Sequence, residues 1–248
     1  MEEAALQTVR QRLAAARAVC VVTGAGMSAE SGIPTFRDAQ TGLWARFDPM
    51  RLASEDGFRA DPELVWDWYA ERRDGVRAAQ PNAGHAALAA FARSRPGRLT
   101  IVSQNVDDLH QRAGCVDTIR LHGNILEDRW LAPCPRHRDC RVGAAVPGRP
   151  PRCASCENLV RPGVVWFGEM LPPSALEAAQ HAARQCEVML VVGTSGAVWP
   201  AAGLAELARR AGAFVAIVNP NGSEIDDQAQ VVLRRSAATA LPLLLAGL

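Results

Sequence analysis

The chain has 248 residues, of which 48% are hydrophobic and 21% charged, and its formal net charge is +1 at pH 7. That length is enough for one sizeable core with a small appended module. The nearly balanced charge gives no reason to expect nucleic acid or an acidic membrane surface as a partner. The amino terminus lacks a cationic region followed by an apolar run, and no apolar stretch reaches the roughly 18 residues of a membrane span. We therefore expect a cytoplasmic globular protein without a signal peptide or a membrane span.

Helical and strand patterns alternate along the chain. Amphipathic or capped segments predict helices, and short apolar, β-branched runs predict strands. The expected helices span 3–16, 61–76, 83–94, 174–186, 201–211 and 236–246, and the expected strands span 19–22, 99–102, 118–121, 164–167, 187–192 and 214–218. This alternation favours an α/β fold, a Rossmann-like parallel sheet with helices on both faces. Open sheets of this kind bind ligands at the carboxyl ends of their strands.

A glycine turn follows the first expected strand. Gly24-Ala25-Gly26 permits positive φ and a close approach of phosphates to the backbone. Residues 27–30 are expected to begin a helix whose free N–H groups would face an anion. With Ala29 in the third place, the turn matches the dinucleotide fingerprint in its G-x-G-x-x-A form. The alternative is a tightly packed strand and turn that bind no nucleotide.

The residues after this turn depart from an ordinary dehydrogenase. No second apolar strand ending in Asp or Glu follows about 20 residues later, where a ribose-binding carboxylate would be expected. Instead, Ser31 to Asp38 forms a loop that carries an aromatic ring, Phe36, and a guanidinium, Arg37. Such a loop can cover a nucleotide, although an arginine on a loop is more often solvated.

Three further polar motifs follow expected strands: Gln104-Asn-Val-Asp107, Leu121-His-Gly123 and Gly193-Thr-Ser195. Taken singly, these residue types serve strand-end capping and turns, and a lone histidine is more often structural. Together with Gly24 to Arg37, and in the same order, the motifs resemble those of the sirtuin family, the NAD-dependent protein lysine deacylases. The resemblance covers nearly the whole chain.

The resemblance implies a reaction and a catalytic base. The acyl group of an acyl-lysine on another protein would pass to the ADP-ribose of NAD. The amide oxygen of the acyl-lysine would attack C1′ of the nicotinamide ribose, and nicotinamide would leave. Neutral His122 would then take a proton from a ribose hydroxyl, a step that suits a base with a pKa near 7. The products would be lysine, nicotinamide and O-acyl-ADP-ribose.

The resemblance also implies which residues contact NAD. Asn105 and Asp107 would hold the nicotinamide ribose and carboxamide, and Asn219 would meet the ribose of the adenosine half. Arg37 would reach a phosphate or orient the ribose, and Phe36 would shield the reactive centre. The full expected set is Gly24, Ala25, Gly26, Ser28, Thr35, Phe36, Arg37, Gln104, Asn105, Asp107, Gly193, Thr194, Ser195 and Asn219.

Four of the seven cysteines lie within residues 134–156. In a cytosolic chain, such a cluster favours a metal site over disulfide bonds. Cys153 and Cys156 have the C-x-x-C spacing of a zinc knuckle. The first pair of ligands, which would include Cys134, departs from the sirtuin pattern, since Trp130 stands about where the first cysteine of that pattern would fall. Its ligands are either Cys134 and Cys140, which we prefer, or Cys134 and His137. Four protein ligands would make the zinc structural; a site that has lost its metal is the alternative.

A helix rich in aromatic residues bears on which acyl group the protein would accept. Tyr69 and Arg72 are three residues apart and share a helix face. Their spacing is similar to that of the desuccinylase-type (class III) branch of the sirtuins, where a phenol and a guanidinium bind the carboxylate of a succinyl, malonyl or glutaryl chain. Arginine suits a carboxylate because it bonds bidentately. Ala53 falls where that branch keeps a small residue. The alternative is an ordinary helix with its arginines in solvent.

Two segments are similar to the edges between which a sirtuin binds its peptide as an added strand. The substrate residues expected on these edges are Val165, Trp166, Phe167, Gly196 and Val198. Both segments also serve as core strand and loop. The expected NAD-binding domain comprises 1–36, 80–127 and 164–248. A small domain would combine a helical insert, 37–79, with a zinc-binding insert, 128–163.

Three rival functions remain at this point. The first is a sirtuin that acts mainly as a deacetylase, with Tyr69 and Arg72 idle. The second is an NAD-sensing module without turnover. The third is a dehydrogenase, which rests only on the glycine turn.

Overall fold

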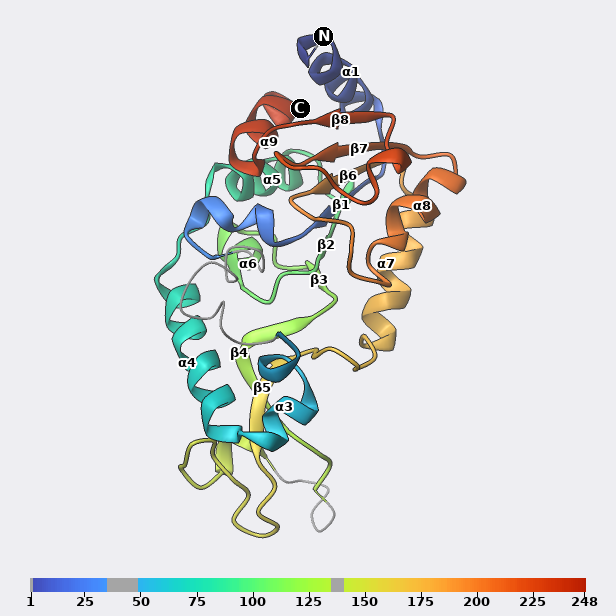
Figure 1. Ribbon diagram of the computed structural model, residues 1–248. Helices are drawn as coiled ribbons and strands as arrows, with labels where there is room; N and C mark the ends of the chain where they lie inside the picture. The colour runs from blue at the N-terminus through green and yellow to red at the C-terminus, as the bar shows by residue number, and fades with distance from the viewer. Residues whose placement is uncertain (1, 35–48, 135–140) are drawn as a thin grey trace.

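The computed structural model describes residues 2–34, 49–134 and 141–248. Its main feature is a six-stranded sheet in the order β3-β2-β1-β6-β7-β8, in which every neighbouring pair is parallel. A second sheet pairs β4 with β5 in antiparallel fashion below the first (Figure 1). The strands are β1 (Val19–Thr23), β2 (Leu99–Ser103), β3 (Ile119–Arg120), β4 (Gly123–Trp130), β5 (Val160–Val164), β6 (Val188–Val192), β7 (Phe214–Val218) and β8 (Val231–Leu233).

Helices cover both faces of the six-stranded sheet (Figure 1). One face carries α1, α5 and α9, and the other carries α7 and α8. The helices are α1 (Glu2–Ala15), α2 (Pro49–Leu52), α3 (Glu55–Ala60), α4 (Pro62–Ala78), α5 (Ala83–Ser94), α6 (Leu109–Ala113), α7 (Pro173–Gln185), α8 (Gly203–Arg210) and α9 (Ala237–Leu245). The predicted α/β class is confirmed.

The central strand β1 explains why both faces are covered. Successive side chains of a strand point to opposite faces. Accordingly, Val19 and Val21 pack into the core under α1, α5 and α9, whereas Cys20 and Val22 pack into the core under α7 and α8. All five residues of β1 are buried, which is typical of a strand inside a parallel sheet.

The strand order reverses between β1 and β6. The chain runs outward from β1 through β2 to β3, returns to β6 beside β1, and runs outward again through β7 and β8. Open α/β sheets bind ligands at such a switch point, outside the carboxyl ends of the strands. Here these ends are Thr23 and Val192, which lie side by side in the β1–β6 register.

The second sheet packs against α3 and α4 around its own apolar cluster. Phe58, Val65 and Tyr69 from the helices meet Ile125 of β4 and Trp166. Helix α4 begins where the sequence predicts, with Asp61 accepting the N–H of Leu64 and Pro62 as its first residue. This cluster fixes the face of α4 that carries Tyr69.

Some predicted elements are wrong or displaced. Residues 27–30 do not begin an α-helix, because 25–27 and 29–31 form two separate 3₁₀ turns. The strand expected at 164–167 lies at Val160–Val164, and β4 and β8 were not predicted at all. No helix in the described ranges is both long and apolar enough to cross a membrane.

Candidate active site

The glycine turn lies at the switch point, against the end of β6. The N–H of Gly26 donates to the carbonyl of Gly193 at 2.8 Å. A Cβ on Gly26 would lie 2.7 Å from Cα of Gly193, and a Cβ on Gly24 would lie 2.8 Å from the Gly193 carbonyl oxygen. These contacts are too close for any side chain, so this backbone packing alone requires the glycines of the turn. Close packing is therefore sufficient to explain the dinucleotide fingerprint.

Ser28, Asn105 and Asp107 form a buried polar cluster beside this turn. The Asn105 amide donates to Ser28 Oγ at 3.1 Å, and the Ser28 hydroxyl donates to Asp107 Oδ2 at 2.9 Å. The other carboxylate oxygen of Asp107 accepts the N–H of Leu109 at 3.0 Å. Burial raises the pKa of Asp107 above its ordinary value, and the bonds from Leu109 and Ser28 oppose this. The cluster joins the β1 turn to the segment after β2.

His122 follows β3 at the same edge of the sheet. Its Nδ1 lies 2.8 Å from the main-chain carbonyl of Gln104. A carbonyl only accepts hydrogen bonds, so the ring carries its proton on Nδ1 and Nε2 keeps a free lone pair. Burial lowers the pKa of His122 below its ordinary value, against the bond to Gln104. The ring is therefore neutral near pH 7 and is presented as a base.

Gly123 allows β5 to cross beside this histidine. It has a φ of +80°, and a Cβ there would lie 2.2 Å from the carbonyl oxygen of Gly163. The N–H of Val165, just after β5, donates to the His122 carbonyl at 2.9 Å. The close approach that Gly123 permits is therefore made by another segment of the chain.

Thr194 and Asn219 join the carboxyl ends of three strands. The Asn219 amide donates to the Thr194 carbonyl at 3.2 Å, and the Gln104 amide donates to Thr194 Oγ1 at 3.4 Å. The neighbouring Ser195 carbonyl accepts the N–H of Glu224 at 2.8 Å. Ala25 is exposed at the turn. These expected NAD residues thus share one edge with Ser28, Asn105 and His122.

Tyr69 and Arg72 lie together on α4, where Tyr69 is buried and Arg72 is half-buried. Tyr69 is buried, and its hydroxyl oxygen accepts the indole N–H of Trp166 at 3.0 Å. The Arg72 guanidinium lies 4.5 Å over the Trp68 ring. Its buried Nε has no hydrogen-bond partner among the described residues. Burial raises the pKa of Tyr69 and lowers that of Arg72, while each group partly offsets the shift of the other.

The adjacent Arg73 differs from Arg72 in its polar partners. Its Nε donates to the Ile125 carbonyl at 2.6 Å, and its Nη2 pairs with Asp128. Arg73 is thus committed to holding α4 against β4, whereas the charge of Arg72 is left without an acidic partner among the described residues. A partly buried charge without an acidic partner is costly, so this position would suit an anion.

Only some of the residues expected on the two peptide-binding edges lie as expected. The N–H of Phe167 donates to the Ala53 carbonyl at 2.9 Å, so Ala53 lies against that edge. Phe167 and Val198 are 43% and 40% exposed, as edge residues should be. Trp166, expected on the same edge, instead buries its ring under Tyr69. Gly196 has a φ of +74° and is packed against Ile225 and Ser223.

Three of the four expected zinc ligands converge. The sulfur atoms of Cys134, Cys153 and Cys156 lie within 4.8 Å of one another. Thiolates are preferred zinc ligands, so the donor set fits this metal. The fourth expected ligand, Cys140, lies outside the described residues, as do its alternative His137 and three expected NAD residues, Thr35, Phe36 and Arg37.

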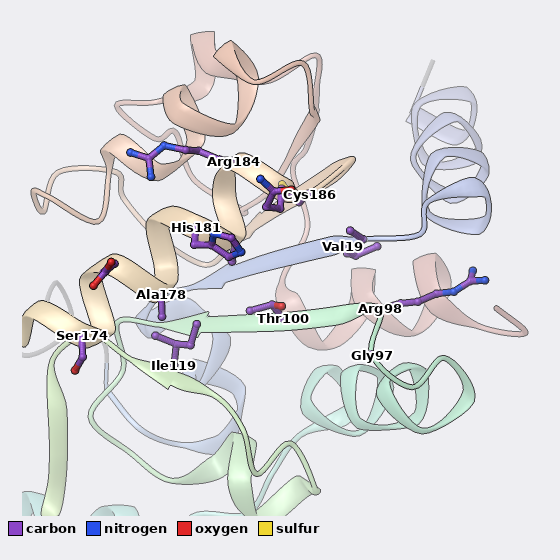
Figure 2. A pocket seen from close by; sticks show the side chains of 14 residues that line it. Val19, Gly97, Arg98, Thr100, Ile119, Ser174, Ala178, His181, Arg184 and Cys186 are labelled. Carbon is purple, nitrogen blue, oxygen red and sulfur yellow. The ribbon is translucent and has the colours of Figure 1, made fainter.

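An open pocket of about 690 Å³ lies elsewhere, at the amino ends of the strands. Figure 2 shows Val19, Thr100 and Ile119 on its floor, with Ala178 and His181 of α7 above them. None of the predicted site residues lines it. The pocket is therefore separate from the polar edge described above.

The family pattern described as the Sir2 family matches residues 24–200. A protein of Ralstonia nicotianae named NAD-dependent protein deacylase is 54% identical over 245 residues, which cover 99% of this chain and 98% of that protein. This chain belongs to the Sir2 family, the sirtuins. A crystal structure of a Sir2 homologue in complex with NAD has a TM-score of 0.83 and 40% identity, over 99% of this chain and 93% of that one.

A second solved sirtuin is bound to a propionylated peptide. It has a TM-score of 0.79 and 30% identity, over 95% of each chain. The sirtuin fold of the present chain accounts for the polar edge at the switch point. What sequence reasoning missed is the bond from Trp166 to Tyr69 in this sirtuin, since nothing in the sequence predicts that these two side chains meet.

Proposed function

We propose that this sirtuin is an NAD-dependent protein-lysine deacylase. The observation that carries the proposal is neutral His122, fixed through Nδ1 at the carboxyl edge of the sheet with its Nε2 unprotonated and not hydrogen-bonded by the part of the chain that the structure describes. Related proteins named NAD-dependent protein deacylases, and solved sirtuins in complex with NAD and with a propionylated peptide, support it. Without these relatives and solved structures, the same polar edge would fit an NAD-sensing module equally well.

The polar edge fits NAD in position and in chemistry. It lies at the strand reversal, and it offers hydroxyl, amide and carboxylate groups to ribose hydroxyls and a carboxamide. When bound, NAD supplies the ADP-ribose that accepts the acyl group. Asn105 and Asp107 would hold the nicotinamide half, and Thr194, Ser195 and Asn219 the adenosine half. His122 would take the proton of a ribose hydroxyl at Nε2.

Among acyl groups, we propose that those ending in a carboxylate are accepted, succinyl and malonyl, together with acetyl. Because the Tyr69 oxygen already accepts the Trp166 indole N–H, its own O–H is left to donate. The half-buried Arg72, whose Nε is buried, adds a positive charge that no described acidic residue neutralises. A donor and a cation on one helix face form a site for a carboxylate. Ala53, beside Phe167, would leave room for the longer chain.

We further propose a structural zinc held by Cys134, Cys153 and Cys156 with Cys140 as the fourth ligand. Closed sites of this kind stabilise a fold and take no part in catalysis. The division into an NAD-binding domain and a small domain from two inserts stays a prediction. So do the cytoplasmic location and acylated lysines of other proteins as substrates.

Two peptides that differ only in one lysine, succinylated or acetylated, test the proposal when kcat/KM is compared in the presence of NAD. We expect turnover of both, with a preference for the succinyl peptide. A preference for the acetyl peptide would keep the deacylase and remove the role of Tyr69 and Arg72. Turnover of neither peptide by a chain that still binds NAD would favour the sensing module.

A further inference from the structure

Two buried histidines lie beneath the proposed NAD site and have no role in the reaction described above. His85 of α5 is 0% exposed and His110 of α6 is 2% exposed. Their ring centroids are 4.9 Å apart, with an interplanar angle of 60°. Each ring has one buried nitrogen without a hydrogen-bond partner among the described residues, Nε2 of His85 and Nδ1 of His110. Buried polar atoms are rarely left unpaired, so this pair needs an explanation.

The proton position on His85 follows from its other nitrogen. The main-chain N–H of Asn82 donates to Nδ1 of His85 at 3.3 Å. A main-chain N–H can only donate, so this nitrogen carries no proton in the neutral ring. Nε2 of His85 is therefore an N–H donor for which the described residues offer no acceptor.

The proton position on His110 has two alternatives. Its Nε2 lies 3.0 Å from Thr23 Oγ1, which is also 3.0 Å from Ser103 Oγ. If Thr23 donated to His110, Nδ1 of His110 would be an N–H, and two donors without acceptors would be buried on adjacent rings. If His110 donates to Thr23, its Nδ1 is an acceptor and matches the free donor of His85. The second arrangement alone satisfies both rings, through one buried water that would bridge the two nitrogens.

This arrangement continues to the proposed active site. With its oxygen accepting from His110, Thr23 donates its hydroxyl proton to Ser103 Oγ. The same Ser103 oxygen accepts the main-chain N–H of Asn105 at 3.1 Å. Asn105 in turn donates to Ser28, which donates to Asp107. The histidine pair thus meets the Ser28–Asn105–Asp107 cluster at the hydroxyl of Ser103.

We propose that His85, His110, Thr23 and Ser103 form a one-directional hydrogen-bond chain that positions Asn105 for NAD, with both histidines acting as positioning residues. The chain also links four elements that must stay in register. His85 is at the start of α5, Thr23 and Ser103 end the neighbouring strands β1 and β2, and His110 is on α6. Hydrogen-bond chains of this kind fix a geometry only when every member is paired.

The chain requires both rings to be neutral, and their surroundings favour this. Burial lowers the pKa of His85 to about 4, and the nearby Arg112 adds to the effect. Burial lowers the pKa of His110 to about 3, and His85 and Arg120 contribute in the same direction. Each ring therefore keeps one donor and one acceptor across the neutral pH range.

The first test reads the proton positions without any reaction. Nitrogen-15 NMR of histidine-labelled protein, with single variants to assign the five histidines, distinguishes the two neutral tautomers of each ring. We expect His85 and His110 both to carry the proton on Nε2, while His122 carries it on Nδ1. A proton on Nδ1 of His110, or a charged ring at pH 7, would overturn the proposal.

The second test breaks the chain at Thr23→Val, which keeps a β-branched strand residue and removes the hydroxyl. Because a buried hydrogen bond is lost, we expect the KM for NAD and the calorimetric Kd for ADP-ribose to rise roughly tenfold. The KM for the acyl peptide should not change. Thr100→Val, a half-buried β2 threonine outside the chain, is the matched control and should leave these constants unchanged.

A double-variant cycle separates a chain from two independent contacts. We expect Thr23→Val with His110→Leu to weaken ADP-ribose binding hardly more than the worse single variant, since either change breaks the same chain. His110→Gln, which keeps a donor and an acceptor, should restore most of the affinity. Additive losses, or no rescue by glutamine, would refute the chain. The inference rests on the proposed NAD site; failure of the unaltered protein to bind ADP-ribose would refute that site, whereas the NMR result would stand or fall independently.

Discussion

The Nδ1 of His122 is bound to the main-chain carbonyl of Gln104 at 2.8 Å, one residue before Asn105. The carbonyl therefore selects the tautomer that leaves Nε2 free, and it connects the proposed base to the segment that would hold nicotinamide. A hydrogen bond at the ring nitrogen that does not take part in the reaction commonly orients a catalytic imidazole.

The first prediction concerns pH. A base acts in its neutral form, so activity falls as the pH drops through the pKa of His122. Burial lowers this pKa below the ordinary histidine value of about 6.5. The acid limb of the kcat/KM profile should therefore lie below pH 6.5, and activity should be constant from about pH 7 upward until another group titrates. An acid limb above pH 7 would contradict a base that is half-buried and neutral.

The second prediction concerns the two adjacent arginines. Arg72→Met removes a guanidinium that has no acidic partner among the described residues, and a charge-assisted hydrogen bond contributes about 1.5–3 kcal/mol. We expect kcat/KM for a succinyl peptide to fall roughly 10- to 100-fold, with little change for the acetyl peptide. Equal losses on both peptides would contradict a carboxylate site.

Arg73→Met is the matched control for this change. Arg73 holds the Ile125 carbonyl and Asp128, so its loss leaves buried groups unpaired. We expect a lower Tm and no change in the ratio of succinyl to acetyl activity in the fraction that remains folded.

The third prediction concerns the direction of the Tyr69 hydroxyl. Trp166→Phe removes the indole N–H and frees the oxygen to reorient. Since one neutral hydrogen bond is lost, succinyl activity should fall roughly 3- to 10-fold more than acetyl activity. Phe58→Leu disturbs the same packing, 5.2 Å from Trp166 between ring centroids, without touching this bond. The same selective loss in Phe58→Leu would assign the effect to packing.

The fourth prediction concerns the cysteine cluster. If Cys134, Cys153 and Cys156 hold zinc, the purified protein should contain about one zinc per chain, and Cys153→Ser should lose it. Metal bound only by the folded state stabilises that state, so the variant should have a lower Tm. A Tm that neither a chelator nor Cys153→Ser alters would indicate a site without metal. Cys115→Ser, at a buried cysteine outside the cluster, is the control.

Sequence patterns predict the main sheet well because period and polarity are local. The buried runs of β1, β2, β6 and β7 and the capped helices α4 and α5 lie where expected. Strand β8 has only three residues, and β4 carries the polar run Glu127-Asp128-Arg129, so neither has a strand pattern of its own. Pairing with a neighbouring strand makes them strands, and a single segment does not reveal it.

The candidate site also has features that the sequence predicts and contacts that it does not. The polar residues at the carboxyl ends of strands are predictable, because the topology brings those ends together. The turn at Gly24 to Gly26 was expected to lead into a helix, and its contact with Gly193 comes from another strand about 170 residues away. The bonds of Trp166 to Tyr69 and of His110 to Thr23 also join distant segments, and only the folded chain shows them.

The most direct test follows both products of one reaction. The protein would be incubated with NAD and an acyl-lysine peptide, and released nicotinamide and free-lysine peptide would be quantified in the same samples. The account predicts equal amounts of the two at every time, strict dependence on NAD, and loss of both in His122→Tyr while NAD binding persists. Deacylation without nicotinamide release, or nicotinamide release that His122→Tyr leaves unchanged, would contradict it.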